Sequence, residues 1–263
     1  METLFSLKGK NALVTGGSGH LGSVMCLALA RQGANVYINA RKKDKKLNGL
    51  IDKIRKEGFQ AQSLIFDITD FKKTKNKINS LSVPIHILIN NAYSGEGGTI
   101  ESSENIDYES SFNKILISSQ YIFKCLLPLL RKGAKNNKSV SVINVSSIYG
   151  QISPNLSIYP DTKSTNPPFY GSAKAALIQW TKYAACEFGK ENIRINSISP
   201  GAFPSSDYQK KHPQIVKKIS NLIPMKRIGD PRELKGIIIF LASEESSYIN
   251  GQNITIDGGW TAW

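Results

Sequence analysis

Residues 15–22 read TGGSGHLG, a stretch with four glycines and one histidine. It follows the apolar run 11–14 and precedes a helical pattern that begins near residue 20, so its G-x-G-x-x-G spacing lies in a strand-to-helix turn. Glycines in such a turn let the backbone approach a pyrophosphate, whose charge the helix N-terminus then stabilises. An ordinary glycine-rich turn is the alternative. The residues that we expect to contact a dinucleotide are Gly16, Ser18, Gly19, His20, Leu21 and Gly22.

Strand and helix patterns alternate along the rest of the chain. Strands are predicted near 11–15, 35–39, 62–66, 85–90, 139–145, 193–198 and 252–256. Helices are predicted near 20–32, 44–57, 70–80, 107–131, 168–190 and 230–243. This alternation predicts an α/β protein with a Rossmann-like doubly wound parallel sheet in a three-layer α/β/α sandwich, with ligands at the carboxyl ends of the strands. No linker or repeat interrupts it, so we expect a single domain over 1–263.

Composition limits the class of protein. Hydrophobic residues make up 40%, no apolar run is long enough to cross a bilayer, and the start METLFSLKGK lacks the apolar core of a signal peptide. We therefore expect a cytoplasmic protein with no membrane segment. Cys26, Cys125 and Cys186 lie in apolar helical patterns without pairing or metal-ligand spacing, so we expect reduced core thiols and no metal site.

The net charge of +14 comes almost entirely from lysine. The densest runs, 42–46, 72–77 and 210–218, fall on predicted helix or loop surface and lack interleaved aromatic residues. These runs indicate a solvated surface, and we expect no nucleic-acid partner. A basic surface favours anionic small molecules through its summed field.

Several further motifs accompany the first loop. They are Asn90-Asn91-Ala92, Ser146-Ser147, Y-x-x-x-K at 170–174, N-x-x-x-P-G at 196–201 and D-G-G at 257–259. Together they resemble the shorter, single-domain members of the short-chain dehydrogenase/reductase family along the whole chain. The first loop departs from that subgroup, because T-G-x-x-G-x-x-G is typical of the longer nucleotide-sugar epimerases and leaves His20 free to face solvent, phosphate or adenosine.

The resemblance implies catalytic roles for Ser147, Tyr170 and Lys174. Tyr170 and Lys174 are four residues apart and share one helix face, so the ammonium can favour a phenolate that exchanges the proton of an alcohol or ketone. Ser147 is expected to hold the substrate oxygen. Ile115 stands where the family usually has an Asn that anchors a relay water, and Asn113 lies two residues away on nearly the opposite side of the helix.

The resemblance also implies cofactor contacts by Asp67 at the adenine, and by Ile68, Asn90, Ala92, Pro200 and Gly201. NAD-specific sites place an acidic residue at the end of the second strand, where this chain has Ala40 followed by Arg41. The guanidinium of Arg41 can pair with a 2′-phosphate. We therefore expect a preference for NADP(H), with NAD(H) still possible.

Residues 148–169 form a longer connection than is usual in the family. Its polar and aromatic residues favour a polyhydroxylated, polar or anionic substrate, and the chain looks like short-chain dehydrogenases associated with bacterial surface-sugar synthesis. A surface excursion or an oligomer contact is the alternative for this segment.

We expect an oxidoreductase acting on a sugar or sugar phosphate; a 3-oxoacyl-carrier-protein reductase and a non-catalytic dinucleotide-binding protein are the alternatives. Relatives are commonly dimers or tetramers built on the helices near 107–131 and 168–190, and a homotetramer is expected.

Overall fold

Parallel strands form one sheet in the computed structural model, which describes residues 4–135 and 139–262. Within these residues the sheet has seven strands in the order β3-β2-β1-β4-β5-β6-β7. The strands are β1 Asn11–Val14, β2 Asn35–Ala40, β3 Ala61–Ile65, β4 Ile87–Asn90, β5 Val140–Val145, β6 Ile193–Pro200 and β7 Asn253–Ile256. The order reverses between β1 and β4, which opens a crevice at their carboxyl ends. The predicted doubly wound, single-domain fold is confirmed.

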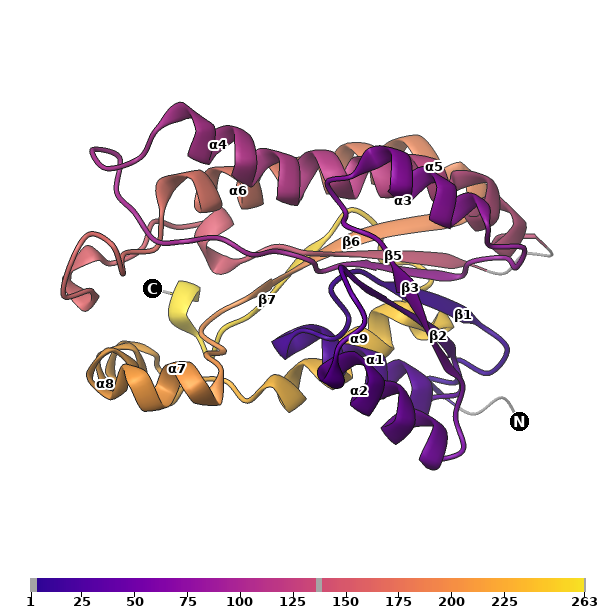
Figure 1. Ribbon diagram of the computed structural model, residues 1–263, viewed down its shortest axis with the longest axis horizontal. Coiled ribbons are helices and arrows are strands. Elements are labelled where there is room, and N and C mark those ends of the chain that lie inside the picture. The colour runs from indigo at the N-terminus through magenta and orange to yellow at the C-terminus, as the bar shows by residue number, and fades with distance from the viewer. Residues whose placement is uncertain (1–3, 136–138, 263) are drawn as a thin grey trace.

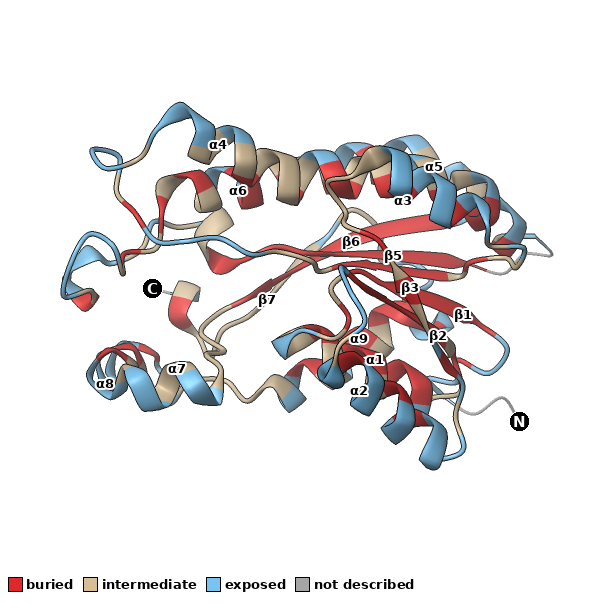
Figure 2. Cartoon of the chain, viewed as in Figure 1, coloured by how far each residue is buried: buried red, intermediate tan, exposed pale blue. Residues whose placement is uncertain are grey.

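Helices cover both faces of the sheet (Figure 1). One face carries α1 His20–Arg31, α2 Lys45–Lys56 and α9 Leu234–Ala242, and the other carries α3 Phe71–Asn79, α4 Asn105–Phe112, α5 Ser118–Gly133 and α6 Pro168–Phe188. Strand β1 serves both layers, because Val14 packs with Met25 and Leu29 while the adjacent Leu13 packs with Leu88 and Leu126. Figure 2 shows the result, with buried residues concentrated in the strands and on the inward helix faces.

The predicted helix near 107–131 is interrupted. The chain runs from α4 through a π-helical turn, Asn113–Ile117, into α5. The i→i+5 hydrogen bonding of such a turn leaves no signature in the hydrophobic pattern, which is why the sequence predicted one continuous helix. Two short helices, α7 Ser206–Lys211 and α8 Pro213–Leu222, were also not predicted.

The connection 148–169 is ordered and packs against the C-terminal part of the chain. Ile158 is buried in a cluster with Ile215 and Ile219 of α8 and with Trp260. Two 3₁₀ turns, Ile148–Gly150 and Leu156–Ile158, shape this segment. Figure 1 shows α7, α8 and the C-terminus together at one end of the molecule. The connection is therefore part of a wall at that end rather than a free surface loop.

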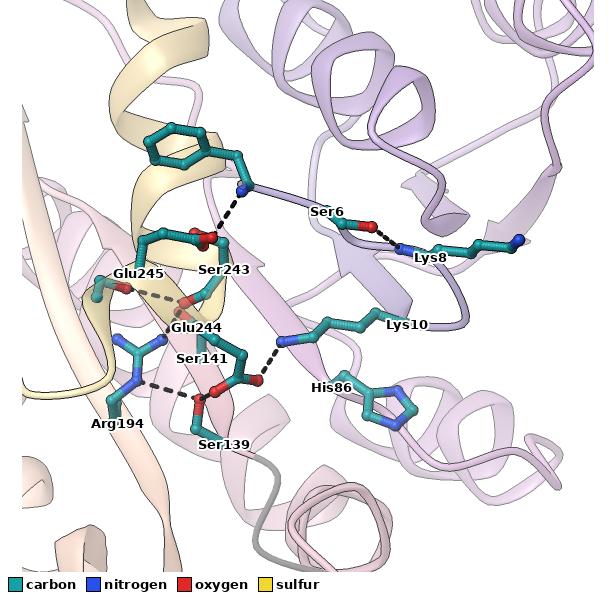
Figure 3. A network of polar contacts seen from close by, with 12 residues as sticks. Ser6, Lys8, Lys10, His86, Ser139, Ser141, Arg194, Ser243, Glu244 and Glu245 are labelled. Carbon is teal, nitrogen blue, oxygen red and sulfur yellow. Dashed lines mark hydrogen bonds and ion pairs between the residues drawn. The ribbon is translucent and has the colours of Figure 1, made fainter. Parts of the chain in front are cut away.

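A polar network closes the opposite edge of the sheet, where the strands begin (Figure 3). Lys10 Nζ lies 2.7 Å from Glu244 Oε1, and Ser139 Oγ donates to Glu244 Oε2 at 2.7 Å. Arg194 is buried and donates to the carbonyls of Leu241 and Ser243. Burial lowers the pKa of Arg194, and Glu244 opposes that shift. The network fixes the residues just before β1 and β5 and the start of β6 to the end of α9 and the turn that follows it, and it lies away from the carboxyl-end crevice.

The cysteines do not all lie in the core. Cys26 is buried and its thiol donates to the Gly17 carbonyl at 3.5 Å, whereas Cys186 is exposed and Cys125 is partly buried. The expectation of core thiols was wrong for Cys186, because α6 turns that position to solvent. Within 4–135 and 139–262, no helix is long and apolar enough to span a membrane, and no group of three or more His, Cys, Asp or Glu side chains is placed to hold a metal ion.

Candidate active site

A cleft of about 870 Å³ opens at the carboxyl ends of the central strands. Fourteen of the predicted site residues line it. They are Gly16, Ser18, Gly19, His20, Leu21, Arg41, Asp67, Ile68, Ala92, Ser147, Tyr170, Lys174, Pro200 and Gly201. The residues that the sequence reasoning did not name as contacts include Asn39, Asn91, Tyr93, Lys114 and Phe203.

Gly22 and Asn90 lie behind the cleft rather than in its lining. A Cβ at Gly22 would collide with the Gly16 carbonyl and would lie 2.9 Å from Asn91 Nδ2. Asn90 Nδ2 donates to Asn144 Oδ1 at 2.9 Å across the sheet. Gly22 therefore permits close packing beneath the loop, and Asn90 ties β4 to β5.

Two asparagines hold the phosphate loop in place. Gly16 has a φ of +59°, and its amide donates to Asn39 Oδ1 at 3.2 Å. Asn39 Nδ2 in turn donates to the Leu64 carbonyl at 3.2 Å, so the loop is tied to β3 through the end of β2. Asn91 Nδ2 donates to the carbonyls of Thr15 and Gly16 at 3.0 and 3.2 Å. In the sequence, the feature that could have identified Asn39 is its polar side chain near the end of a largely apolar strand.

Helix α1 begins at this loop without a capping side chain. Asp44 caps α2 and Asp70 caps α3 through bonds to backbone amides, but the N-cap of α1 is Gly19 and its first turn holds no acidic residue. The first amides of a helix lack intrahelical partners, so these donors face the cleft ready for an anion. An uncapped helix start above a glycine turn fits a dinucleotide pyrophosphate.

His20 does not stand free as expected. Its Nε2 lies 3.0 Å from the Phe203 carbonyl, and a carbonyl can only accept, so Nε2 carries the proton. This bond joins the phosphate loop to the segment that leads into α7. His20 thus connects the cofactor end of the cleft with the wall around α8.

The far end of the cleft is lined by two basic side chains, Arg41 and Lys42, and by two carboxylates, Asp44 and Asp67. Arg41 is exposed directly after β2, and no ion pair of Arg41 occurs in the described part of the chain. Asp67 Oδ1 accepts from the amide and the hydroxyl of Thr69 at 2.9 and 2.7 Å. This turn holds the Asp67 carboxylate at the rim, while Arg41 remains available to a ligand.

Ser147, Tyr170 and Lys174 meet where β5 ends and α6 begins. Lys174 is buried and its Nζ donates to the Val145 carbonyl at 2.6 Å. Burial lowers the pKa of Lys174 to about 7. Tyr170 keeps part of its side chain exposed in the cleft, yet loss of solvent raises its pKa to about 12, and a hydrogen bond with Ser147 opposes the rise. In the protein alone, desolvation is thus the dominant effect on both groups.

An aromatic ring completes this end of the cleft. The ring centroids of Tyr93 and Tyr170 are 4.9 Å apart, with an interplanar angle of 44°. Both tyrosines pack on a cluster of Ile115, Ala173 and Leu177, so the position expected for a relay Asn is filled by a buried apolar side chain. Tyr93 directly follows the Asn90-Asn91-Ala92 motif, and its place beside that motif was the available signal.

A second cavity of about 510 Å³ adjoins the cleft and shares Tyr93, Ser94 and Lys114 with it. Its lining is rich in hydroxyls. The remaining lining residues are Gly95, Glu96, Gly97, Ser102, Ser103, Asp107, Ser110, Ser111 and Phe169. Polar side chains therefore continue from the Tyr170 end of the cleft toward α4.

Comparison with known proteins extends these observations over the whole chain. Residues 19–261 match the family model described as enoyl-(acyl carrier protein) reductase. The curated rhamnolipids biosynthesis 3-oxoacyl-(acyl-carrier-protein) reductase of Pseudomonas aeruginosa is 33% identical, with 99% of each chain covered. The 2-dehydro-3-deoxy-D-gluconate 5-dehydrogenase of Formosa agariphila is 31% identical, covering 97% of this chain and 94% of the relative. A solved structure described as a Pseudomonas aeruginosa RhlG/NADP active-site complex has a TM-score of 0.87 and 32% identity, with 99% of each chain covered.

Proposed function

Since the chain belongs to the short-chain dehydrogenase/reductase family of oxidoreductases, we propose that it interconverts a secondary alcohol and a ketone of a sugar or sugar phosphate with NADP(H), in one domain over 1–263. The observation that carries this proposal is the meeting of Ser147, Tyr170 and Lys174 in the cleft that the uncapped start of α1 also enters. The amides at the start of α1 can hold a pyrophosphate at one end of the cleft, and Tyr170 can exchange a proton with a substrate at the other.

The three side chains divide the work at the substrate oxygen. Ser147 donates a hydrogen bond to that oxygen, and Tyr170 gives or takes its proton. The pKa of Tyr170 is about 12 in the protein alone, so a positive charge nearby is needed to lower this pKa toward 7. Lys174 supplies such charge at a pH below its own pKa of about 7. The cofactor, when bound, accepts or donates the hydride.

The cofactor proposal rests on charge at the two ends of the phosphate loop. The amides at the start of α1 and Ser18 would hold the pyrophosphate, and Arg41 would pair with a 2′-phosphate. Ala40 offers no carboxylate to repel that phosphate or to bond both ribose hydroxyls, which supports NADP(H) over NAD(H). The NADP complex of the RhlG structure, at 32% identity, adds support.

The substrate proposal rests on the hydroxyl-rich walls near Tyr170. The second cavity is lined by several serines and Lys114. The gluconate-derivative dehydrogenase among the relatives supports a polyhydroxylated substrate. A 3-oxoacyl thioester on an acidic carrier is the second candidate, favoured by the Pseudomonas relative and the net charge of +14.

A substrate screen with one matched variant tests the reaction. Purified protein is assayed with NADP⁺, NADPH, NAD⁺ and NADH against sugars, sugar phosphates, the corresponding ketoses and an acetoacetyl thioester. We expect turnover with a sugar-type substrate, and we expect Tyr170→Phe to abolish it while leaving the Kd for NADPH within a few fold. Unchanged turnover in Tyr170→Phe would refute the mechanism, and activity confined to the thioester would favour the second candidate.

We further propose a cytoplasmic homotetramer or dimer built on α5 and α6. Ile117, just before α5, and Tyr183 of α6 are large side chains that remain exposed in the single chain. Sedimentation of the wild type and of Tyr183→Glu tests this assembly. A wild type that sediments as a monomer at micromolar concentration would exclude it.

A further inference from the structure

We infer that Tyr93 is a positioning residue for the proton-transfer pair, because its ring and the ring of Tyr170 together hold the Lys174 ammonium in the cleft. The inference rests on the proposed function, because only that function makes Tyr170 and Lys174 a proton-transfer pair. The contacts that support it are a property of the folded chain and can be measured without substrate.

The ammonium of Lys174 has few partners. Its Nζ lies 5.7 Å from the ring centroid of Tyr93 and 5.5 Å from that of Tyr170. The Val145 carbonyl accepts from it at 2.6 Å, and no carboxylate in the described ranges forms an ion pair with it. Aromatic faces attract a cation within about 6 Å, and more strongly where water is excluded. Two rings and one carbonyl therefore stabilise this charge.

Packing fixes the Tyr93 ring in place. Ile115 and Leu177 belong to the cluster on which the ring rests, and burial raises the pKa of Tyr93, which keeps it neutral. Its hydroxyl lies at position 95, where a Cβ would collide with it. Gly95 thus leaves room for the hydroxyl. The ring, and not the hydroxyl, is the part of Tyr93 that acts on Lys174.

Removing the ring should be visible in the titration of Lys174. The titratable groups beside Lys174 are Tyr170 on its own helix and Tyr93 opposite, with Tyr149 adjoining Tyr170. Both neighbouring tyrosines are neutral at pH 7, because burial raises the pKa of each. Loss of the Tyr93 face would disfavour the ammonium and lower the pKa of Lys174 below about 7. At neutral pH a smaller fraction of the protein would then carry the charge that assists Tyr170.

The test compares Tyr93→Leu with Tyr93→Phe in protein labelled at lysine Cε with ¹³C. Lys174 is identified by its titration near pH 7 and by the loss of that signal in Lys174→Arg. We expect Tyr93→Leu to lower the pKa of Lys174 by about half to one unit and Tyr93→Phe to leave it within ~0.2 units. The pH at which kcat declines on the alkaline side should move lower in Tyr93→Leu by a similar amount, because the ammonium that assists Tyr170 is lost at lower pH, whereas in Tyr93→Phe this pH should stay at its wild-type value.

Gly95→Ala is a second way to weaken the contact between the Tyr93 ring and the Lys174 ammonium, because it displaces the ring without removing it. It should shift the Lys174 titration in the same direction as Tyr93→Leu. An unchanged Lys174 pKa in Tyr93→Leu, or an equal shift in Tyr93→Phe, would overturn the inference; should Tyr93→Leu not fold, an unshifted Lys174 pKa in Gly95→Ala would do so. Failure of the proposed reaction would appear elsewhere, as turnover that survives Tyr170→Phe, and would leave the titration intact.

Discussion

Replacing Lys174 by Met should stabilise the folded protein at neutral pH even though it removes a proposed catalytic group. The pKa of Lys174 falls from 10.5 to about 7 because the ammonium is buried. Between these two pH values the unfolded chain binds more protons than the folded one, so the stability of the wild type rises as the pH increases through that window. At 1.36 kcal/mol per pKa unit, burying the charge costs about 4 kcal/mol at pH 7.

Part of that gain is offset by a lost hydrogen bond. Met cannot donate to the Val145 carbonyl, and an unsatisfied buried acceptor costs about 1–3 kcal/mol. The net expectation for Lys174→Met is a gain of about 1–3 kcal/mol in the free energy of unfolding at pH 7. By about pH 10 the wild-type lysine is neutral when folded and only partly charged when unfolded, so the cost of burying the charge falls to about 1 kcal/mol and Lys174→Met should no longer be more stable than the wild type.

Urea denaturation at pH 7 and pH 10 measures both quantities. Lys182→Met is the matched control, since Lys182 is an exposed lysine on the same helix and its replacement should change stability by less than about 0.5 kcal/mol. The reasoning is refuted if Lys174→Met is less stable than the wild type at pH 7, or if the difference between the two does not depend on pH.

Three further substitutions probe other parts of the site. Arg41→Ala should weaken NADPH binding about tenfold and NADH binding much less, because it removes a charge-assisted bond to the 2′-phosphate; equal losses in a fluorescence titration would argue against that contact. Gly22→Ala should lower the free energy of unfolding by about 1–3 kcal/mol and impair binding of either dinucleotide, because its Cβ meets the Gly16 carbonyl. The control Gly49→Ala, in open space on α2, should leave stability unchanged or raise it. Urea denaturation and dinucleotide titration of both variants test this difference. Ile158→Ala should loosen the wall formed with Ile215 and Ile219, raising KM severalfold with little change in cofactor Kd; a change in sedimentation alone would indicate an oligomer contact instead.

The parts of the fold that repeat along the chain were predictable from the sequence. The alternation of Leu13 and Val14 across β1, and the four-residue spacing of Tyr170 and Lys174, follow from the periods of strand and helix. Parallel strands bring their carboxyl ends to one edge, so residues from distant motifs were expected in one cleft, and most of them line it.

What could not be predicted depends on three-dimensional contacts. Asn39 and His20 each act through a partner far along the chain, Gly16 and Phe203 respectively, and no local pattern encodes such a pairing. The π-helical turn at 113–117 shifts hydrogen bonding by one residue without changing the apolar spacing. Helix α8 is short, and it is stabilised by burying Ile215 against a segment more than fifty residues earlier in the chain.

The different exposure of the Cys26 and Cys186 thiols allows local opening of the phosphate loop to be measured in the unaltered protein. Cys26 lies directly beneath the phosphate loop and bonds the Gly17 carbonyl, and burial raises the pKa of its thiol, while Cys186 is open to solvent. A thiol reagent should therefore modify Cys186 at once and reach Cys26 only during local opening of the loop. Dinucleotide at a hundred times its Kd should slow the second event by about a hundredfold, so the alkylation rate of Cys26 would time the opening of this loop in the unaltered chain.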